Sequence, residues 1–594
     1  GKKMMSIPAS TRFANLARRS CVRLLSTRQQ QQNEELPRTC DYERFYSYPP
    51  EPGFVKNSPF ESINIPNCTI DQYVWTNLRE WENRVAAVCG ITDRQYTYAE
   101  MRDHCATLAV RLQKLGYKPG DSIAVCIPNF PEFPIAALGA LEAGLVVTTV
   151  NPIYTPEEIC RQLVDADAKF VVTTVDRYDA IKEACALTKT SIRIATMRLR
   201  ATEVLPEGAI DFAELINPDG VDFSALNRPN TTIEDIAFLP YSSGTTGLPK
   251  GVQLTHRNIT SNCEMLKATT DGIPIVHQTT PDYQEVLPCV LPFFHIYGLT
   301  VTLLSKMNLG CKLVTLPRFH PDSFLNAMAK YKGSVLHLVP PIIIMLGHHD
   351  KVKPQHMESI RIVMSGAAPM GTPDAERFKA RAPHAGFVQG YGLTETSPVV
   401  LMSRVGSQNY ASVGHPVPNT QAKVVDLNDP TRTGLGPNTV GELLVRGPQI
   451  MRGYHNRKEA TDEMLMEDGW LRTGDLAYYD ETDHFYITDR LKELIKVKGF
   501  QVPPAELEEI LRDHPKVADA AVIGIPHQLS GEVPRAFVVP KNGGQVTEKE
   551  LQEYIAGKVA SYKRLDGGVE FVEAIPKSAT GKILRRELKL KFCP

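Results

Sequence analysis

The chain reads Tyr241-Ser242-Ser243-Gly244-Thr245-Thr246-Gly247-Leu248-Pro249-Lys250-Gly251 directly after the apolar run Ile236-Ala237-Phe238-Leu239. The glycines let the backbone approach an anion closely and turn its N–H groups toward it, and the hydroxyls add further donors. Lys250 adds a mobile positive charge. This composition is typical of a loop that holds a triphosphate behind a buried strand.

The spacing of this loop differs from that of a Walker loop, in which a glycine, four residues and Gly-Lys-Ser/Thr open a helix. Here Leu248-Pro249-Lys250-Gly251 follows the glycine, and the proline is incompatible with that helix start. The loop is therefore not that of a kinase or an ordinary ATPase. Because Gly, Ser and Thr also cluster in ordinary loops, its interpretation depends on the rest of the chain.

Four further motifs follow in order: Gln389-Gly390-Tyr391-Gly392-Leu393-Thr394-Glu395-Thr396, Gly469-Trp470-Leu471-Arg472-Thr473-Gly474-Asp475, Asp489-Arg490-Leu491-Lys492-Glu493-Leu494-Ile495-Lys496-Val497-Lys498-Gly499, and Pro576-Lys577-Ser578-Ala579-Thr580-Gly581-Lys582. Together with the first loop they resemble the acyl-adenylate-forming superfamily of acyl-CoA synthetases, 4-coumarate-CoA ligases, beetle luciferases and peptide-synthetase adenylation domains. The resemblance covers about residues 54–590. The segments 292–298 and 501–506 are most similar to the coumarate-ligase and luciferase branch.

Apolar, strand-like runs alternate with helical patterns and predict α/β layers around largely parallel sheets; these runs occupy residues 122–127, 146–150, 170–174, 236–239, 286–291, 335–339 and 360–364. From about Ser412 short strands and turns predict a small β-rich subdomain. After Asp489, helical segments at 504–511 and 548–558 and strands at 520–525 and 536–539 predict a small α+β domain. We therefore expect a large AMP-binding domain at 54–488 and a small mobile C-terminal domain at 489–594.

The composition is that of a globular protein, with 42% hydrophobic and 22% charged residues among 594. Lys plus Arg, at 66, nearly equal Asp plus Glu, at 67, which argues against bulk attraction to nucleic acid. We expect no transmembrane segment, because the most apolar stretch, residues 133–150, contains Glu142 and reads better as a buried helix followed by a strand. The 12 cysteines are scattered singly and predict reduced thiols without a structural metal.

The first 36 residues differ in kind from the rest. They are rich in arginine and serine, contain no acid before Glu34, and place Phe13, Leu16, Ser20 and Leu24 at helical spacing. This is the composition of a mitochondrial transit peptide, although a disordered basic tail would have the same charge. We predict a transit peptide at 1–36 and residence in the mitochondrial matrix, with Met4 or Met5 as alternative starts.

The resemblance implies ATP, Mg²⁺ and CoA as cofactors and a small carboxylic acid as the substrate. Joining a carboxylate to the α-phosphate of ATP requires cations and preorganised donors, since two anions must approach each other. Glu395 is the expected Mg²⁺ ligand, and Asp475 with Arg490 the expected ribose contact; alone, Thr394-Glu395 or Gly474-Asp475 would be ordinary turns. The implied nucleotide-binding residues are Ser242, Ser243, Gly244, Thr245, Thr246, Gly247, Lys250, Gly366, Ala367, Ala368, Gln389, Gly390, Tyr391, Gly392, Thr394, Asp475 and Arg490.

The resemblance makes Lys582 the central catalytic residue, able to reach both the carboxylate and the α-phosphate. It also implies that the C-terminal domain turns about Lys492 after adenylation and presents Lys496 and Gln501 for thioester formation, with Lys498 and Gly499 along the path of CoA. Solvated lysines and a charged hairpin are the plain alternatives.

His295 matches the family's gate beside the acyl pocket, although a lone histidine is more often a core residue. The expected pocket walls are His295, Tyr297, Val301, Gly366, Gly390, Pro398 and Val399. Tyr297 suits a phenolic acid, whereas Val301 would leave a phenol hydroxyl without a partner. We therefore predict an ATP-dependent acyl-CoA ligase for medium-chain fatty acids. The alternatives are a 4-coumarate-CoA ligase-like enzyme for aromatic carboxylates, an enzyme that passes its acyl group elsewhere, and a non-catalytic acyl-nucleotide binding protein.

The N-terminal segment is testable by itself. A fusion of residues 5–36 to a fluorescent reporter is expected to accumulate in mitochondria, because the segment combines basic charge with a helical apolar face. Fluorescence microscopy against a matrix marker measures this. A reporter that stays diffuse in the cytosol contradicts the prediction, and a fusion with the arginines changed to glutamine serves as the control.

Overall fold

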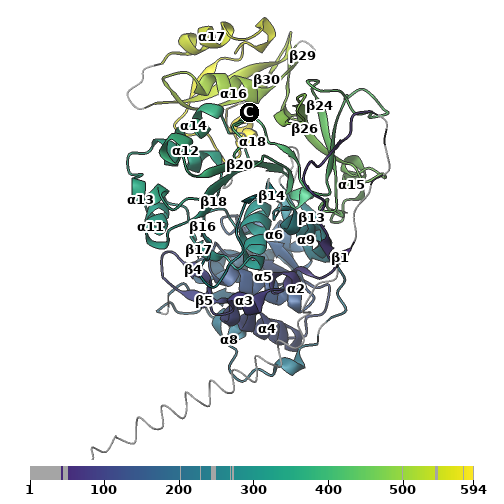
Figure 1. Ribbon diagram of the computed structural model, residues 1–594, viewed down its shortest axis with the longest axis vertical. Coiled ribbons are helices and arrows are strands. Elements are labelled where there is room, and N and C mark those ends of the chain that lie inside the picture. Colours follow the sequence, from purple (N-terminus) through teal and green to yellow (C-terminus); the bar gives the residue numbers. More distant parts are fainter. Residues whose placement is uncertain are drawn as a thin grey trace, which may run out of the picture.

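The computed structural model describes residues 42–43, 48, 51, 53–200, 202–227, 229–242, 249–267, 269–270, 273–368, 370–497, 500–541, 546–578 and 581–592. Figure 1 shows the N-terminal elements, purple to blue, at the lower end of the molecule and the C-terminal elements, yellow-green, at the upper end. Among the described residues, no helix is both long and apolar enough to span a membrane. The proposed transit peptide at 1–36 lies outside the described residues.

The largest sheet has nine strands in the order β10-β9-β8-β6-β7-β11-β13-β12, with β25 paired to β13. In this order, β10, β9, β8, β6, β7 and β11 pair in parallel with their neighbours. Strand β13 then runs antiparallel to β11. The bounds are β6 Ser122–Val125, β7 Val146–Thr149, β8 Ala168–Thr174, β9 Arg193–Met197, β10 Ile210–Asp211, β11 Ile236–Phe238, β12 Tyr241–Ser242, β13 Lys250–Thr255 and β25 Gly453–Tyr454. The four strands expected here are confirmed, since a parallel strand covered on both faces needs an unbroken apolar run.

Two smaller sheets complete the α/β layers, with orders β16-β17-β4-β5 and β18-β19-β20-β21-β22. Their bounds are β4 Val85–Cys89, β5 Gln95–Thr97, β16 Val286–Cys289, β17 Lys312–Thr315, β18 Val335–Leu338, β19 Ile362–Ser365, β20 Gly386–Gly392, β21 Val399–Met402 and β22 His415–Pro416. The remaining three expected strands are thereby confirmed. In Figure 1, α12 (Pro340–His348) and α14 (Thr372–Arg381) lie together beside the second of these sheets.

Capping boxes start the main helices of the large domain. Thr97 begins α4 (Tyr98–Lys114), Thr155 begins α6 (Pro156–Asp165) and Thr255 begins α9 (His256–Met265), each paired with an acidic or amide side chain three residues later. Helix α5 (Glu132–Glu142) is buried along its whole length and leads into β7, which confirms the interpretation of residues 133–150. Further helices are α2 Ile70–Val74, α3 Leu78–Trp81, α7 Tyr178–Thr188, α8 Phe212–Ile216, α10 Ser305–Asn308, α11 Pro321–Tyr331, α13 Pro354–Met357 and α15 Lys458–Met464.

An antiparallel sheet of order β2-β23-β24-β26-β27 forms the β-rich subdomain, at the upper right of Figure 1. Its bounds are β2 Lys56–Asn57, β23 Gln421–Val425, β24 Gly441–Arg446, β26 Leu471–Tyr479 and β27 Phe485–Arg490. The change of texture expected from about Ser412 is confirmed. The strand β27 ends where the C-terminal elements begin.

The C-terminal elements form a small α+β unit with a sheet of order β29-β28-β31-β30 and β32 beside β31. Their bounds are β28 Ile495–Val497, β29 Phe500–Val502, β30 Val517–His527, β31 Gly531–Pro540, β32 Val569–Phe571, α16 Pro504–Arg512, α17 Glu548–Ala556 and α18 Arg585–Phe592. Apolar side chains of this unit, such as Ile495, Leu507 and Val522, form clusters separate from the main core. The fold class, a large α/β domain with a small α+β C-terminal domain, is confirmed, and the boundary at 489 stays our proposal.

Within the part of the chain that the structure describes, most cysteines follow the expectation of free thiols and Cys68 does not. Free thiols are present at Cys89, Cys105, Cys126, Cys160, Cys185, Cys263, Cys289 and Cys311. Burial raises the pKa of the Cys185 thiol to about 11 and that of Cys126 to about 12, so both stay protonated and unreactive. The expectation is wrong for Cys68, which is disulfide-bonded.

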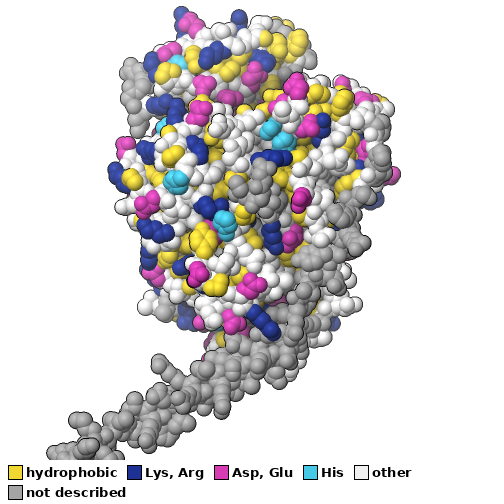
Figure 2. Space-filling model, in the orientation of Figure 1, with side chains coloured by type: hydrophobic (Ala, Val, Ile, Leu, Met, Phe, Trp, Pro, Cys, Tyr) yellow, Lys and Arg dark blue, Asp and Glu magenta, His cyan; other side chains and the backbone are white. Residues whose placement is uncertain are grey.

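Charged side chains of both signs mingle on the surface. Figure 2 shows dark blue and magenta side chains interspersed over one face, without an extended area of one sign. This distribution agrees with a net charge of -1 for the chain. This face therefore offers no extended basic stripe of the kind that nucleic acid binding requires.

Candidate active site

A cleft of about 470 Å³ opens where the large domain, the β-rich sheet and the C-terminal domain meet. Strands β7 and β19 bring their carboxyl ends to it through Thr149 and Ser365, the edge at which α/β sheets place ligands. All five sequence motifs contribute to its walls. The predicted residues that line it are Ser242, Lys250, His295, Tyr297, Gly366, Ala367, Gly390, Tyr391, Gly392, Thr394, Glu395, Pro398, Val399, Asp475, Arg490, Lys492 and Lys582.

Glu395 joins the phosphate loop to the β-rich subdomain. The hydroxyls of Ser242 and Tyr454 donate to its Oε1 at 2.9 and 2.8 Å, and the residue is 8% exposed. No hydrogen bond to its Oε2 is recorded among the described residues. Lys250 lies nearby, its Nζ 4.9 Å from the centre of the Tyr454 ring.

This arrangement fits Mg²⁺, which binds proteins through one or two carboxylates and leaves its other positions to phosphate oxygens and water. Among the described residues, no three His, Cys, Asp or Glu side chains form a metal cluster, so Glu395 would act with the nucleotide. The predicted loop residues Ser243, Gly244, Thr245, Thr246 and Gly247 lie outside the described residues.

Asp475 and Arg490 face each other because they are paired residues of the antiparallel strands β26 and β27. The Tyr391 hydroxyl donates to Asp475 Oδ2 at 2.6 Å, and Arg490 Nε lies 3.4 Å from Oδ1. Burial raises the pKa of the Asp475 carboxyl, and Arg490 opposes that rise. The result is a buried acceptor whose position is set by strand register, suited to bind a pair of hydroxyl groups.

Glycine is required at Gly392 because a Cβ there would lie 1.7 Å from the carbonyl oxygen of Pro398. The peptide N–H of Leu393 donates to the same carbonyl at 3.2 Å. This close approach fixes the end of β20 against the start of β21. Gly366 and Ala367 also line the cleft, directly after the neighbouring strand β19, and Ala367 adopts a left-handed φ of 69°.

The loop that holds Lys582 turns on itself before it enters the cleft. The N–H of Ser578 donates to the Lys582 carbonyl at 2.8 Å, and the N–H of Lys582 donates to Ser578 Oγ at 3.1 Å. Between them Gly581 has a φ of 80°, and its Cβ position lies 3.5 Å from Pro341 of α12. Glycine therefore allows the turn and brings the lysine against the large domain.

Burial lowers the pKa of Lys582 to about 8; Arg490 adds to this effect, and Glu493 and Asp475 oppose it. The Lys582 ammonium is therefore charged at neutral pH, but it loses its proton more easily than an exposed lysine does. An incoming anion would stabilise the charged form.

Burial, with a contribution from Lys582, also lowers the pKa of His295 to about 4. His295 is thus neutral, and its Nδ1 accepts the N–H of Tyr297 at 3.3 Å, which leaves the hydrogen on Nε2.

The C-terminal domain is tied to β27 by Asp489, which lies three residues before Lys492. Asp489 Oδ2 accepts the N–H of Ala505 in the first turn of α16 at 3.1 Å, and Oδ1 accepts the N–H of Arg490 at 2.7 Å. The bond to Ala505 satisfies one of the free N–H groups at the start of a helix that lacks its own side-chain cap. This contact supports the orientation in which Lys582 reaches the cleft.

Several predicted residues lie away from the cleft. The Gln389 amide donates to the carbonyls of Tyr410 and Ser412, and Val301 is fully buried one helical turn beyond Tyr297. Ala368 does not line the cleft. Lys496 is exposed on β28, where its backbone pairs with that of Gln501. Lys498, Gly499 and the side chain of Gln501 lie outside the described residues.

Sequence reasoning missed Tyr454 and the Glu442–Arg472 pair. Tyr454 stands outside the five motifs, and only the pairing of β25 with β13 brings its hydroxyl to Glu395. Arg472 lies within a motif, and its ion pair with Glu442 at 2.8 Å lines the cleft. The position of Arg472 three residues before Asp475 in that motif could have identified it as a cleft residue from the sequence.

Two family models match the chain. Residues 74–455 match the AMP-binding enzyme and residues 506–582 match the AMP-binding enzyme C-terminal domain. Among curated proteins, 4-coumarate-CoA ligase 3 of Oryza sativa subsp. japonica is 39% identical over 547 residues, covering 91% of this chain and 95% of the relative. The enzyme of the same name from Arabidopsis thaliana is 40% identical over 556 residues, covering 92% and 95%.

Solved structures agree with the fold. ATP-bound MatB from Rhodopseudomonas palustris aligns with a TM-score of 0.77 at 27% identity, covering 89% of this chain and 99% of that one. A benzoate CoA ligase from Burkholderia xenovorans LB400 aligns with a TM-score of 0.76 at 25% identity, covering 88% and 99%. Both likenesses extend over the large and the small domain.

Proposed function

Since the chain belongs to the AMP-binding, adenylate-forming enzyme family and is an ATP-dependent acyl-CoA ligase, we propose that it activates medium-chain fatty acids. The observation that supports ligase chemistry in this chain is the convergence of Lys582 with Asp475 and Arg490 in one cleft. The wall of the proposed acyl pocket supports the choice of acid. We also retain the proposal of a mitochondrial matrix location.

In the first half-reaction, a carboxylate oxygen of the acid forms a bond to the α-phosphorus of ATP, and the bond to the bridging oxygen of pyrophosphate breaks. Asp475 and Arg490 would bind the ribose hydroxyls, and Ser242 and Lys250 the outer phosphates. Glu395 would hold Mg²⁺, which neutralises charge on the phosphates when bound. Lys582 would then contact both the carboxylate and the α-phosphate, offsetting the negative charge that develops between them.

In the second half-reaction, the sulfur of CoA forms a bond to the acyl carbon, the acyl–phosphate bond breaks, AMP leaves and the thiol proton is released. We propose that the C-terminal domain turns about Lys492 between the two steps. The turn would break the bond between Asp489 and Ala505 and bring the hairpin of Lys496 and Gln501 to the cleft. Lys498 and Gly499, on the same hairpin, would line the path of CoA.

The proposed acyl pocket supports an acid without a polar tail. The Tyr297 hydroxyl already donates its hydrogen to the carbonyl of Met364 at 3.0 Å and is buried. It could therefore only accept a hydrogen bond from a phenol. Val301, in the same helix Tyr297–Leu304, is fully buried and does not line the cleft, so it gives a phenol hydroxyl no partner either. An alkyl chain needs no partner, and each buried methylene contributes about 0.8 kcal/mol.

One of the alternatives keeps specific support and another loses it. The identity of about 39% to 4-coumarate-CoA ligases favours an aromatic carboxylate. A non-catalytic acyl-nucleotide binding protein would not need Lys582, whose placement in the cleft argues against it. A panel of carboxylic acids scored for CoA-dependent release of AMP distinguishes all three.

The two half-reactions are expected to separate by mutation, because different faces of the C-terminal domain serve them. Lys582→Ala should slow adenylation by about 10²- to 10³-fold, the usual effect of removing one preorganised charge-stabilising donor, and spare thioester formation from supplied acyl-AMP. Lys496→Ala should do the reverse. Pyrophosphate exchange and single-turnover thioester assays measure the two steps. Lys549→Ala, an exposed lysine of α17, is the control; equal loss of both steps in both variants contradicts domain alternation.

The adenylation rate should depend on pH through Lys582. Its pKa is lowered to about 8, so the charged form is complete well below pH 8 and is lost as the pH rises through that value. Adenylation should therefore decline above about pH 8. Lys582→Arg should be slower yet lack this decline, since guanidinium stays charged. A decline that persists in Lys582→Arg would assign it to another group, and Lys577→Arg on the same loop is the control.

Octanoate should be used with a higher kcat/KM than 4-coumarate. Tyr297→Phe should leave the ratio of the two unchanged, because the hydroxyl bonds Met364 and not the substrate. If the tyrosine instead orients a phenol, the same variant should lose about tenfold or more for coumarate alone. Steady-state kinetics with both acids decide between these outcomes, and a clear preference for coumarate would overturn the proposal.

A further inference from the structure

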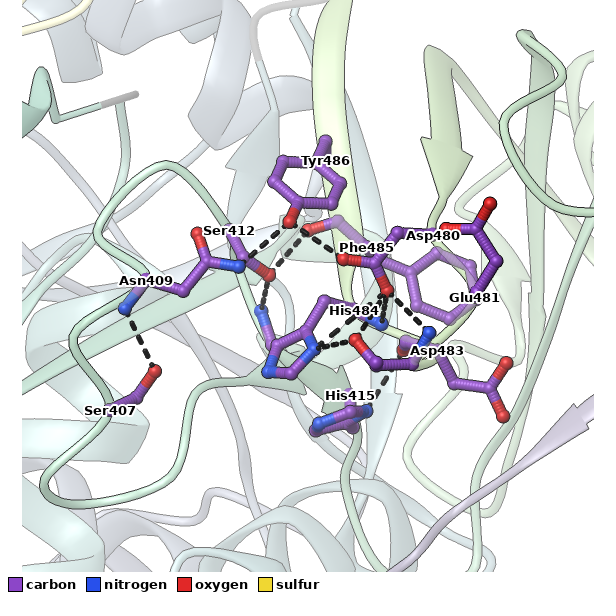
Figure 3. Close-up of polar contacts among 12 residues, drawn as sticks. Ser407, Asn409, Ser412, His415, Asp480, Glu481, Asp483, His484, Phe485 and Tyr486 are labelled. Carbon is purple, nitrogen blue, oxygen red and sulfur yellow. Dashed lines mark hydrogen bonds and ion pairs between the residues drawn. The ribbon is translucent and has the colours of Figure 1, made fainter.

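Two histidines, one in β22 and one in the turn between β26 and β27, pack against each other. His415 begins β22 and is 7% exposed, and His484 precedes β27 with a side chain that is 26% exposed. Their ring centroids are 4.3 Å apart and the rings are tilted by 48°. Backbone bonds between Gly414 and Phe485 set this register, since the N–H of Phe485 donates to the Gly414 carbonyl at 2.8 Å. Figure 3 shows both rings beside the turn.

The hydrogen-bond partners fix the tautomer of His415. Its Nδ1 lies 2.9 Å from the carbonyl oxygen of Asp483, and a carbonyl can only accept, so Nδ1 holds the hydrogen. Burial first, and then the neighbouring His484, lowers the pKa of His415, which favours the neutral ring. A neutral ring with hydrogen on Nδ1 has a lone pair on Nε2.

The same reasoning fixes His484. The Thr482 hydroxyl donates its only hydrogen to Asp480 Oδ1 at 2.7 Å. Asp480 also accepts the N–H groups of Thr482 and His484 at 2.9 and 3.0 Å and the Tyr486 hydroxyl at 2.9 Å, the bonding pattern of an ionised carboxylate that can only accept. Thr482 Oγ1 must therefore accept the Nδ1 hydrogen of His484 at 2.8 Å. When neutral, His484 too has a lone pair on Nε2.

Neither Nε2 has a hydrogen-bond partner among the described residues, and neither ring is fully buried. In Figure 3 the bonded nitrogens of both rings face the turn, and the second nitrogens are directed away from it. Each metal–nitrogen bond is about 2.0–2.1 Å, so two nitrogens on one metal lie within about 4 Å of each other. Imidazole rings whose centroids are 4.3 Å apart are close enough to share one ion. Histidines that bind metals usually donate their other N–H to a carbonyl or a carboxylate-linked group, as both do here.

We infer that His415 and His484 form a binding site for a divalent transition metal such as Zn²⁺, Ni²⁺ or Cu²⁺, through their Nε2 atoms. Imidazole suits these ions, whereas Mg²⁺ and Ca²⁺ prefer oxygen ligands. No third His, Cys, Asp or Glu completes a cluster among the described residues, so water would fill the other positions. Asp480, Glu481 and Asp483 surround the pair with negative charge, opposed by Lys56 and Arg404.

A metal at this site would join the sheet of β22 to the sheet of β27 and stabilise the folded chain by linkage. The site lies outside the cleft and is independent of the acyl substrate. Its ligands are imidazole nitrogens, whereas Glu395 would offer a carboxylate oxygen to the proposed Mg²⁺.

The test uses the full chain without a polyhistidine tag. Calorimetric titration with Zn²⁺ should show one more bound equivalent in the native chain than in His415→Gln or His484→Gln, and electron paramagnetic resonance with one equivalent of Cu²⁺ should show two coupled nitrogens. His348→Gln, an exposed histidine near Asp374, is the matched control and should retain the site. Thr482→Val should weaken binding about 10- to 100-fold, because it removes the partner that orients His484.

Equal stoichiometry in the native and His484→Gln chains, or a Cu²⁺ spectrum with a single nitrogen, overturns the proposal. His484 is the more exposed ring, so its variant decides the result if the His415 variant does not fold.

Discussion

The pairing of β26 with β27 is the constraint on which the site depends. Its register places Asp475 opposite Arg490, and the Tyr391 hydroxyl from β20 then closes on the same carboxylate. Because β27 runs straight into the C-terminal domain, the strand that positions the proposed ribose contact also positions Lys492 and, through Asp489, the start of α16. A shift of one residue in this ladder would move the Asp475 side chain to the other face of the sheet, away from Arg490 and the cleft.

The cleft gathers positive charge before any anion enters it. Lys582, Arg490 and Lys250 all line the cleft, and burial with mutual repulsion lowers the pKa of Lys582. Three of the acidic groups that line the cleft are already engaged, Asp475 and Glu395 by hydroxyls or by Arg490, and Glu442 by Arg472. Such a site is unfavourable when empty and favourable when it holds phosphates and a carboxylate, which is how preorganised electrostatics lower a barrier. The neutral state of His295 follows from the same surroundings.

The turn between β26 and β27 connects this site to the histidine pair. Asp480 organises that turn through bonds to Thr482, His484 and Tyr486, and the pairing of Gly414 with Phe485 fastens it to the sheet of β22. The proposed metal would therefore act on the same ladder that holds Asp475 and Arg490, from its opposite end. A rigid turn is compatible with the proposed rotation about Lys492, since the two lie at opposite ends of β27.

Local patterns in the sequence determined the strands of the α/β layers, the β-rich texture after Ser412 and the helix beginning at Pro504, and the motifs that carry the family resemblance pointed to many residues of the cleft. Apolar runs, capping residues and glycine-rich motifs act over a few neighbours, so they are readable without a structure. The tertiary structure decided what depends on partners far along the chain. It gave Tyr454 its bond to Glu395, turned Gln389 toward Tyr410 and Ser412, engaged the Tyr297 hydroxyl with Met364, and set His415 against His484. These contacts arise from strand register and domain packing, which no short window of sequence encodes.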